Sequence, residues 1–242
     1  RQQILFRISN SLSEFFLVLC RIGEVRFPRI FDLPFVFEDV SAVDRFQNSP
    51  AGEKLKNSMK RRGLKGLAFW HNGMKQMSAN RPLIEPEDAE GLKFRVQASD
   101  VLVAQFEQLG ASPQKMSFKE VYGGLQTKVI DGQENTWSNI YGKKFFEVQD
   151  GVTETNHGIL DYLLVTSTDW WDGLPGDVRD QLGTIVAEVT ETRNAEAFAV
   201  NEKAKDAIVA AGAFHDCFAV KAADIEGVRR SPASQFQCVD AY

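Results

Sequence analysis

GLKFRVQASDVL, at residues 91–102, places a short apolar run directly before an amphipathic one. The run at 92–96 has the length and composition of a buried strand. Ser99 is a candidate N-cap for a helix over 100–109, and Gly110 stands where such a helix normally ends. Because a strand that leads into a helix is the recurring unit of α/β proteins, this stretch predicts an α/β fold.

The same alternation continues on both sides of this stretch. Compact apolar runs predict two further strands, at 64–70 and 162–166. Amphipathic runs predict three helical regions, of which the last is one long helix or two: 117–128, opened by a capping-box spacing, 134–148 and 175–211. The two ends of the chain, 1–29 and 214–242, show no clean periodicity.

The bulk composition is that of an ordinary globular protein, with 43% apolar and 25% charged residues in a chain of 242. A formal net charge of −5 argues against nucleic acid as the main partner, since binding phosphates needs a dense basic surface. No apolar run approaches the roughly 18 residues that a membrane span requires. One local basic cluster is interpreted as a solvated helix face rather than a phosphate-binding patch: Lys54, Lys56, Lys60, Arg61, Arg62 and Lys65.

Sequence motifs for catalysis, metal binding and cofactor binding are missing. There is no HExxH pattern, no glycine-rich phosphate loop and no GxSxG nucleophile elbow. The cysteines do not form a disulfide or metal-ligand pattern, and the histidines have no companion ligand at metal spacing: Cys20, Cys217, Cys238, His71, His157 and His215. The sequence therefore predicts no catalytic residue, no metal and no cofactor.

Arg95 lies inside the predicted strand at 92–96, among apolar residues. A buried guanidinium without a partner is costly, so Arg95 either pairs with a carboxylate of the protein or binds an anionic ligand. A guanidinium can hold a carboxylate through two parallel hydrogen bonds, which orients the ligand as well as binding it. The residues alone leave these two possibilities open.

Other polar groups also lie beside predicted strands. Lys75 follows the strand at 64–70, where open α/β sheets place ligands, although by itself it is an ordinary solvated lysine. The run QENTWSN at 133–139 is dense in donors and acceptors, and it also fits the polar start of a helix. His157 precedes another strand, where a structural role competes with ligand binding.

These segments resemble the TRAP transporter solute-binding protein family of the DctP type. The resemblance extends over 30–211, and its form is closest to members that bind four-carbon dicarboxylates. Six ordered blocks support it: IFDLPFVFED (30–39), WHNGMKQMSANRPL (70–83), GLKFRVQASDVL (91–102), GASPQKMSFKEVY (110–122), DGQENTWSNIY (131–141) and TNHGILDYLLV (155–165).

The resemblance implies a two-lobe periplasmic binding protein architecture with mixed sheets, hinge strands and a long bracing helix. Such lobes close around a ligand. We expect 1–94 to form the remainder of the first lobe, with its N-terminal part missing or atypical, so that this lobe is incomplete. Residues 95–180 are expected to form mainly the second lobe, and 181–242 the bracing helix and a C-terminal segment that returns toward the first.

The resemblance also implies a function and a site. The chain is expected to be a periplasmic, non-enzymatic protein, without a signal peptide in this sequence, that delivers a four-carbon dicarboxylate to the permease subunits of a TRAP-type transporter. Arg95 would clamp one ligand carboxylate, Asn135 would hydrogen-bond to it, and Lys75 would be a second cation at the ligand. Two further residues are expected to line the pocket, and three to neighbour it: Phe118 and Tyr162, then Asn72, Gln97 and Trp137.

Two alternatives stay open on the sequence. A carboxylate-sensing domain that signals to a partner would have the same pocket. An enzyme acting on a carboxylate would use His71 or His157 as its base, because these two histidines lie near the polar runs.

Overall fold

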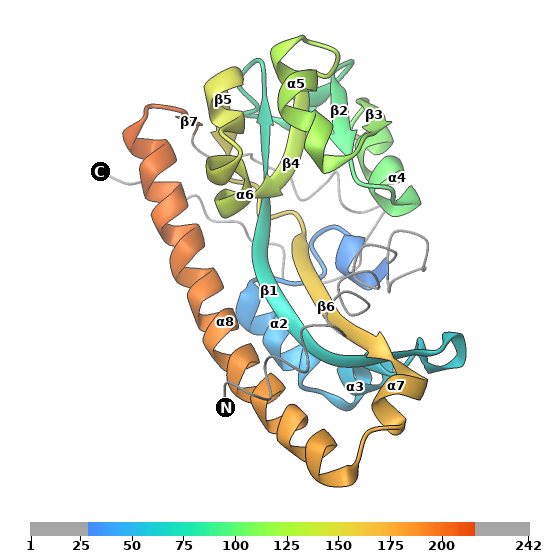
Figure 1. Ribbon diagram of the computed structural model, residues 1–242. Coiled ribbons are helices and arrows are strands. Elements are labelled where there is room, and N and C mark those ends of the chain that lie inside the picture. The colour runs from blue at the N-terminus through green and yellow to red at the C-terminus, as the bar shows by residue number, and fades with distance from the viewer. Residues whose placement is uncertain (1–28, 216–242) are drawn as a thin grey trace. The chain divides into compact units, whose positions relative to one another are not determined.

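The computed structural model describes residues 29–215 and confirms the α/β class. The chain forms two compact units. The first comprises 29–31, Val36–Gly73 and Ile159–Val200, and the second comprises Asp32–Phe35, Met74–Gly158 and 201–215. Strand β1 (Leu64–Ala79) and helix α8 (Gly176–Ala210) each run through both units (Figure 1).

The first unit is built on β1 and its pairing partner, β6. Its helices begin at good capping residues: the Asp39 side chain accepts a hydrogen bond from the N–H of Ala42, and Ser49 caps the next helix. Phe31 packs edge-on against Phe69 in its core. The unit contains α2 (Val40–Gln47), α3 (Pro50–Lys56), η3 (Lys60–Arg62), the first part of β1, β6 (Ile159–Ser167), α7 (Thr168–Asp172) and most of α8.

The second unit contains a mixed sheet, as the resemblance implies. The strands of the described sheet lie in the order β3-β2-β4-β1-β5-β7, with β2 parallel to β3 and β4, and β1 antiparallel to β4 and β5. The elements of this unit after β1 are η4 (Pro86–Ala89), β2 (Lys93–Val96), α4 (Asp100–Gln108), β3 (Ser112–Lys115), η5 (Phe118–Glu120), α5 (Val121–Gln126), β4 (Gly132–Thr136), α6 (Trp137–Gly142), η6 (Phe145–Val148), β5 (Gly151–Thr153), the end of α8 and β7 (Phe214–His215). A short helix at Arg29–Asp32, η2, precedes them in the chain.

Two apolar clusters hold the second unit together. In one, α4 packs against β2 (Figure 1). The rings of Phe94 and Phe106 lie there with centroids 4.9 Å apart. In the other, α5 and α6 pack against the end of α8, where Ile208 is fully buried. Burial of these side chains is the main favourable contribution to folding of the unit.

Most of the local predictions are confirmed. The helix expected at 100–109 is α4, and Gly110 follows it with φ +70°, in the left-handed region that glycine favours. The region 175–211 is one helix, α8, and Gly212 ends it in the same way, with φ +71°. Ser99 is the N-cap residue of α4, but its hydroxyl donates to Asp32 and makes no capping bond.

Two predictions of local structure are wrong. The strand expected at 64–70 continues to Ala79, because β4, β5 and β6 pair with β1 and keep its backbone extended. The helix expected at 134–148 is instead β4, then α6, then η6. Strand pairing on both sides holds β4 extended, and Thr136 then caps α6 by accepting from the N–H of Asn139.

The lobe ranges 1–94, 95–180 and 181–242 stay a prediction. The boundaries between the two compact units fall at other positions, within β1 after Gly73, after Gly158 and within α8 after Val200. None of the helices within 29–215 has the length and apolar character that crossing a membrane requires. The three cysteines lie outside the described residues.

Gly132→Ala is expected to destabilise the second unit. An added Cβ would lie 2.6 Å from the Phe94 ring and 2.7 Å from the carbonyl oxygen of Ser78, so β4 would have to shift. We expect a loss of about 1–3 kcal/mol in the free energy of unfolding, measured by urea denaturation.

Gly123→Ala is the matched control, because the same methyl group there meets no atom within 4 Å. On helix α5 it should be neutral or stabilising by up to about 1 kcal/mol. Equal unfolding midpoints for the two variants would contradict the packing argument at Gly132.

Candidate ligand-binding site

Arg95 and Asn135 lie on neighbouring parallel strands of the second unit. Arg95 of β2 is in register with Gln133 of β4, and Asn135 is two residues further along β4. Because side chains alternate between the two faces of a sheet, the three residues share one face. Both Arg95 and Asn135 lie toward the carboxyl ends of their strands, where open α/β sheets bind ligands.

The guanidinium of Arg95 is buried, with only 3% of the residue exposed. Its Nε donates to the carbonyl oxygen of Met116 at 2.9 Å, and the group lies over the Phe118 ring, 5.9 Å from the centroid. Burial lowers the pKa of Arg95, an effect that the charge of Glu134 opposes, and arginine remains protonated at neutral pH. Within 29–215, its terminal nitrogens have neither a hydrogen-bond acceptor nor a carboxylate partner.

The side-chain amide of Asn135 is oriented by its neighbours. Its Oδ1 accepts from Asn139 Nδ2 at 2.7 Å and from the N–H of Thr136 at 3.2 Å. Both bonds require oxygen at that position, so Nδ2 and its two N–H donors occupy the other branch of the amide. In the described part of the chain Nδ2 has no acceptor. A guanidinium and an amide that present unused donors on one sheet face form a good site for a carboxylate.

Lys75 lies on the opposite face of the sheet and is paired with Glu134. It is in register with Thr136, which shares the face of Glu134, and its Nζ is 2.9 Å from Glu134 Oε2. Both side chains are almost fully buried, at 2% and 1% exposed. The interpretation of Lys75 as an ordinary solvated lysine is therefore wrong. Its role as a ligand cation stays a prediction, with its charge already balanced by Glu134.

His157 completes this buried ion pair. Its Nε2 lies 3.2 Å from Glu134 Oε2, and its Nδ1 lies 2.7 Å from the hydroxyl of Thr155. Burial lowers the pKa of His157, although the hydrogen bond to Glu134 opposes this effect. Burial alone would raise the pKa of Glu134, but the charge of Lys75 and the bond from His157 lower it to about 2. Both ring nitrogens of His157 have partners, as a structural role requires.

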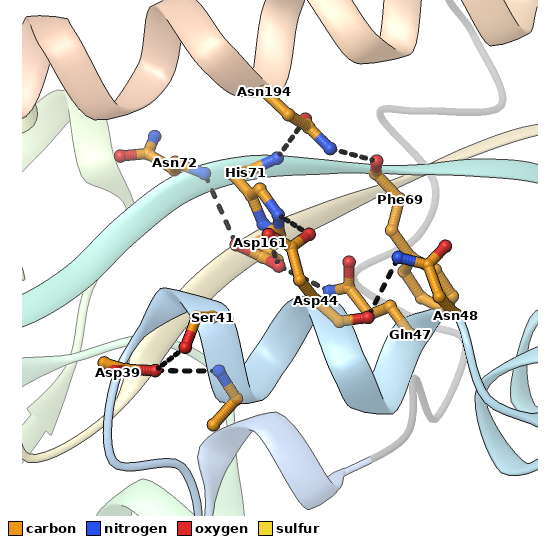
Figure 2. Close-up of polar contacts among 11 residues, drawn as sticks. Asp39, Ser41, Asp44, Gln47, Asn48, Phe69, His71, Asn72, Asp161 and Asn194 are labelled. Carbon is orange, nitrogen blue, oxygen red and sulfur yellow. Dashed lines mark hydrogen bonds and ion pairs between the residues drawn. The ribbon is translucent and has the colours of Figure 1, made fainter.

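His71, the other candidate base, lies between two carboxylates in the first unit (Figure 2). Its Nδ1 is 2.9 Å from Asp161 Oδ2, and its Nε2 is 2.7 Å from Asp44 Oδ1. Burial raises the pKa of Asp161, although the hydrogen bonds and charge of its partners, His71 first, oppose this effect. An ionised carboxylate only accepts hydrogen bonds, so with Asp161 and Asp44 ionised both ring nitrogens hold a proton. Burial opposes protonation, but the bonds and charges of Asp161 and Asp44 outweigh it and raise the pKa of His71 to about 9. A protonated imidazole is not available as a general base at neutral pH.

The carboxylate of Asp161 joins several elements of the first unit. Gln47 of α2 donates to it through Nε2, and the N–H of Asn72 on β1 donates to its other oxygen at 3.4 Å. The backbone N–H of His71 donates in turn to Asn194 of α8 at 2.9 Å (Figure 2). The sequence analysis missed this network, because residues that bond to each other in it are up to 123 positions apart in the sequence and share no spacing motif.

The structure distributes the remaining predicted site residues over both units. In the first unit, Nδ2 of Asn72 donates to the hydroxyl of Tyr162 at 2.7 Å, and Tyr162 is 46% exposed. In the second, Phe118 is half-buried beside Arg95, and Gln97 directly follows β2. Trp137 is 4% exposed and packs in the apolar cluster of α5, α6 and α8. Within 29–215 no group of three or more His, Cys, Asp or Glu is placed to hold a metal ion.

Comparisons with known proteins point to one family. Residues 25–219 match the family model described as bacterial extracellular solute-binding protein, family 7, DctP. The chain is 76% identical over 184 residues to the C4-dicarboxylate-binding periplasmic protein DctP of Vibrio cholerae, covering 76% of this chain and 55% of the relative. It is 46% identical over 201 residues to the protein of the same name from Rhodobacter capsulatus, covering 82% and 60% of the two chains.

Solved structures of TRAP periplasmic solute-binding proteins are also similar to this chain. A TRAP periplasmic solute-binding protein from Shewanella oneidensis, with bound succinate, matches with a TM-score of 0.76 at 49% identity, over 81% of this chain and 64% of that one. A protein of the same description from Pseudomonas aeruginosa, with bound L-malate, also has a TM-score of 0.76, at 46% identity over 81% and 68%. The chain spans about half the length of the curated relatives it matches.

The free energy of unfolding is expected to fall as pH rises from about 6.5 to about 9. The folded-state pKa of His71 is raised from 6.5 to about 9, so its stabilisation is complete below pH 6.5 and is lost as pH passes 9. Allowing for solvent screening, we expect a decrease on the order of 2 kcal/mol in urea denaturation.

Asp44→Asn should move this decrease to lower pH, because it removes one of the two carboxylates that hold the proton. An NMR titration of the histidine ring protons reports the pKa directly. A His71 midpoint near 6.5 in the unchanged protein would contradict the assignment.

Glu134→Gln is expected to destabilise the second unit by about 3–5 kcal/mol, because it leaves the buried ammonium of Lys75 without a counter-charge. Glu147→Gln removes an exposed partner of Lys144 and should leave the urea midpoint almost unchanged. The double variant Lys75→Met with Glu134→Gln should recover part of the loss. Similar urea midpoints for Glu134→Gln and Glu147→Gln would show that the buried pair is unimportant.

Proposed function

This chain belongs to the DctP family of bacterial extracellular solute-binding proteins, family 7, and we propose that it captures a small organic carboxylate for transport. The proposed ligand is a four-carbon dicarboxylate, and the proposed recipient is the permease of a TRAP-type secondary transporter. The proposed location is the periplasm. Relatives named as C4-dicarboxylate-binding periplasmic proteins, and related structures with succinate and L-malate, support the ligand class.

The observation that supports the proposal most directly is the unbalanced charge of Arg95. Every other strongly buried cation described above faces a carboxylate: Lys75 faces Glu134, and His71 faces Asp161. Among the residues that the structure describes, Arg95 donates only to a backbone carbonyl, and its two terminal nitrogens are left with unused donors. A buried guanidinium with unused donors is stabilised most by an anion that accepts two parallel hydrogen bonds, as a carboxylate does.

Asn135 would contribute to the choice of ligand. Its Nδ2 donors are unused on the same sheet face, so a carboxylate held by Arg95 could accept from both residues. A ligand without an acceptor there would leave buried donors unpaired, which costs about 1–3 kcal/mol for each group. This penalty would favour carboxylates over neutral molecules of similar size.

We propose binding without chemistry. The enzyme alternative depends on His71 or His157 acting as a base. His71 is held protonated between two carboxylates, and His157 is buried with both nitrogens bonded. Neither ring has a free nitrogen that could accept a proton from a substrate, so capture and release of an unchanged ligand fit these observations better.

Succinate, malate or fumarate is expected to raise the thermal unfolding midpoint once its concentration exceeds the dissociation constant, and butyrate to raise it much less. Arg95→Lys keeps the positive charge but loses the planar pair of donors, so affinity by calorimetry should fall about 100-fold or more. Arg95→Ala should abolish binding.

Arg179→Ala serves as the control, since it removes a guanidinium from α8 of the first unit and should leave affinity unchanged. Asn135→Asp keeps the shape of the side chain but replaces donors with a negative charge, and it should weaken binding as strongly as Arg95→Lys. Absence of a shift with every carboxylate, or equal affinity for Arg95→Ala and the unchanged protein, would refute the proposal.

A further inference from the structure

A cluster of positive charge in the first unit has no part in the proposed ligand site. Between residues 53 and 65 the sequence holds six basic residues and one acidic residue, a net charge of +5. Since the whole chain has a net charge of −5, the rest of it carries −10. We name this cluster the basic cap: Lys54, Lys56, Lys60, Arg61, Arg62 and Lys65.

The local fold turns the basic cap toward solvent. It is formed by the last turn of α3, the short helix η3 and the start of β1. Met59 anchors the turn between the two helices: it is 4% exposed, and its carbonyl oxygen accepts from the N–H groups of Arg62 and Leu64. With Met59 buried, four basic side chains of the cap are exposed: Lys54, Lys60, Arg61 and Arg62.

These exposed cations are not balanced by the protein. The one acidic residue of the segment, Glu53, pairs with Lys56 at 2.6 Å. Among the described residues, Lys54, Lys60, Arg61 and Arg62 make no ion pair. Cations at the end of a helix interact favourably with its dipole, which explains one or two of them. Three consecutive cations on a single turn also repel one another, so internal stability does not account for the group.

Tryptophan lies next to the basic cap. The N–H of Thr168, at the start of α7, donates to the carbonyl oxygen of Gly63 at 2.8 Å, which fixes α7 beside the cap (Figure 1). Lys65 lies over the ring of Trp171, 5.8 Å from its centroid, and the neighbouring Trp170 is half-buried. Two exposed aspartates of α7, Asp169 and Asp172, reduce the local charge from +5 to +3.

We propose that the basic cap docks the first unit, weakly and reversibly, on anionic phospholipid headgroups. Exposed lysine and arginine beside tryptophan is the composition that proteins present to an anionic membrane surface. Nucleic acid fits less well, because the half-buried Trp170 beside the cations suits the boundary between headgroups and acyl chains, which a track of phosphates does not offer. For a protein that delivers a ligand to a membrane transporter, such attraction would shorten the search for the recipient.

Sedimentation with vesicles tests this docking. The unchanged protein should pellet at low salt with vesicles of equal parts phosphatidylglycerol and phosphatidylcholine, and remain in solution with pure phosphatidylcholine. Raising the salt from about 0.05 M to about 0.5 M should lower the ratio of bound to free protein about tenfold or more, since exposed charges are then screened. The triple variant Lys60→Gln, Arg61→Gln, Arg62→Gln should lower it to the same extent at low salt.

A second triple variant removes the same charge elsewhere: Lys93→Gln, Lys119→Gln and Lys203→Gln, all exposed. It should retain vesicle binding, and both triple variants should keep the succinate affinity and thermal midpoint of the unchanged protein. Equal loss of vesicle binding in both variants would overturn the proposal, because net charge alone would then explain it. The protein could instead fail to bind anionic vesicles but be retained on immobilised polyglutamate, with retention lost when Lys60, Arg61 and Arg62 are replaced. That result would overturn lipid docking and identify a docking surface for an acidic protein.

Discussion

The ion pair between Lys75 and Glu134 is the interaction on which the second unit depends. A charge in the interior of a protein is tolerated only when a partner and hydrogen bonds replace the water it has lost. Here the pair joins β1 to β4, and His157 adds a third contact to the same carboxylate. With β4 held in this way, the next residue along it, Asn135, projects to the opposite face beside Arg95.

In the first unit the deeply buried charge that needs a partner is an anion instead of a cation. Asp161 is its buried carboxylate, with a side chain only 1% exposed, and His71 is the cation that balances it. The network extends through Gln47, Asn72 and Asn194 to four elements of the unit. Both ring nitrogens of His71 and of His157 have such partners, so a structural role accounts for their place among polar runs. Arg95 stands out because it alone among these buried cations has no protein carboxylate within 29–215.

Two kinds of positive charge therefore have different surroundings in this protein. Arg95 is buried, fixed by Met116 and Phe118, and suited to hold one small anion in a defined orientation. Four cations of the basic cap, Lys54, Lys60, Arg61 and Arg62, are exposed and make no ion pair with the described residues, and water and salt weaken each of their interactions. Under the two proposals, burial would make binding at Arg95 specific, while the number and exposure of the cap cations would suit a broad, weakly bound surface.

The sequence by itself determined the features that depend on neighbouring residues: the strand at 92–96, the helix at 100–109, the long helix at 175–211 and the α/β class. Its ordered blocks also determined the family, and they named Arg95 and Asn135 as the residues to inspect. Only the tertiary structure decided that 132–136 is a strand and that β1 continues to Ala79, because strand pairing outweighs local helix preference.

The partners of the buried charges were likewise decided by tertiary structure alone. Lys75 and Glu134 are 59 residues apart, and His71 and Asp161 are 90 residues apart, so no local pattern connects them. Sequence periodicity records which face of an element is buried, but the choice of ion-pair partner depends on which strands become neighbours. For that reason Lys75 resembled a solvated lysine in the sequence, and the fold placed it in the interior beside a carboxylate.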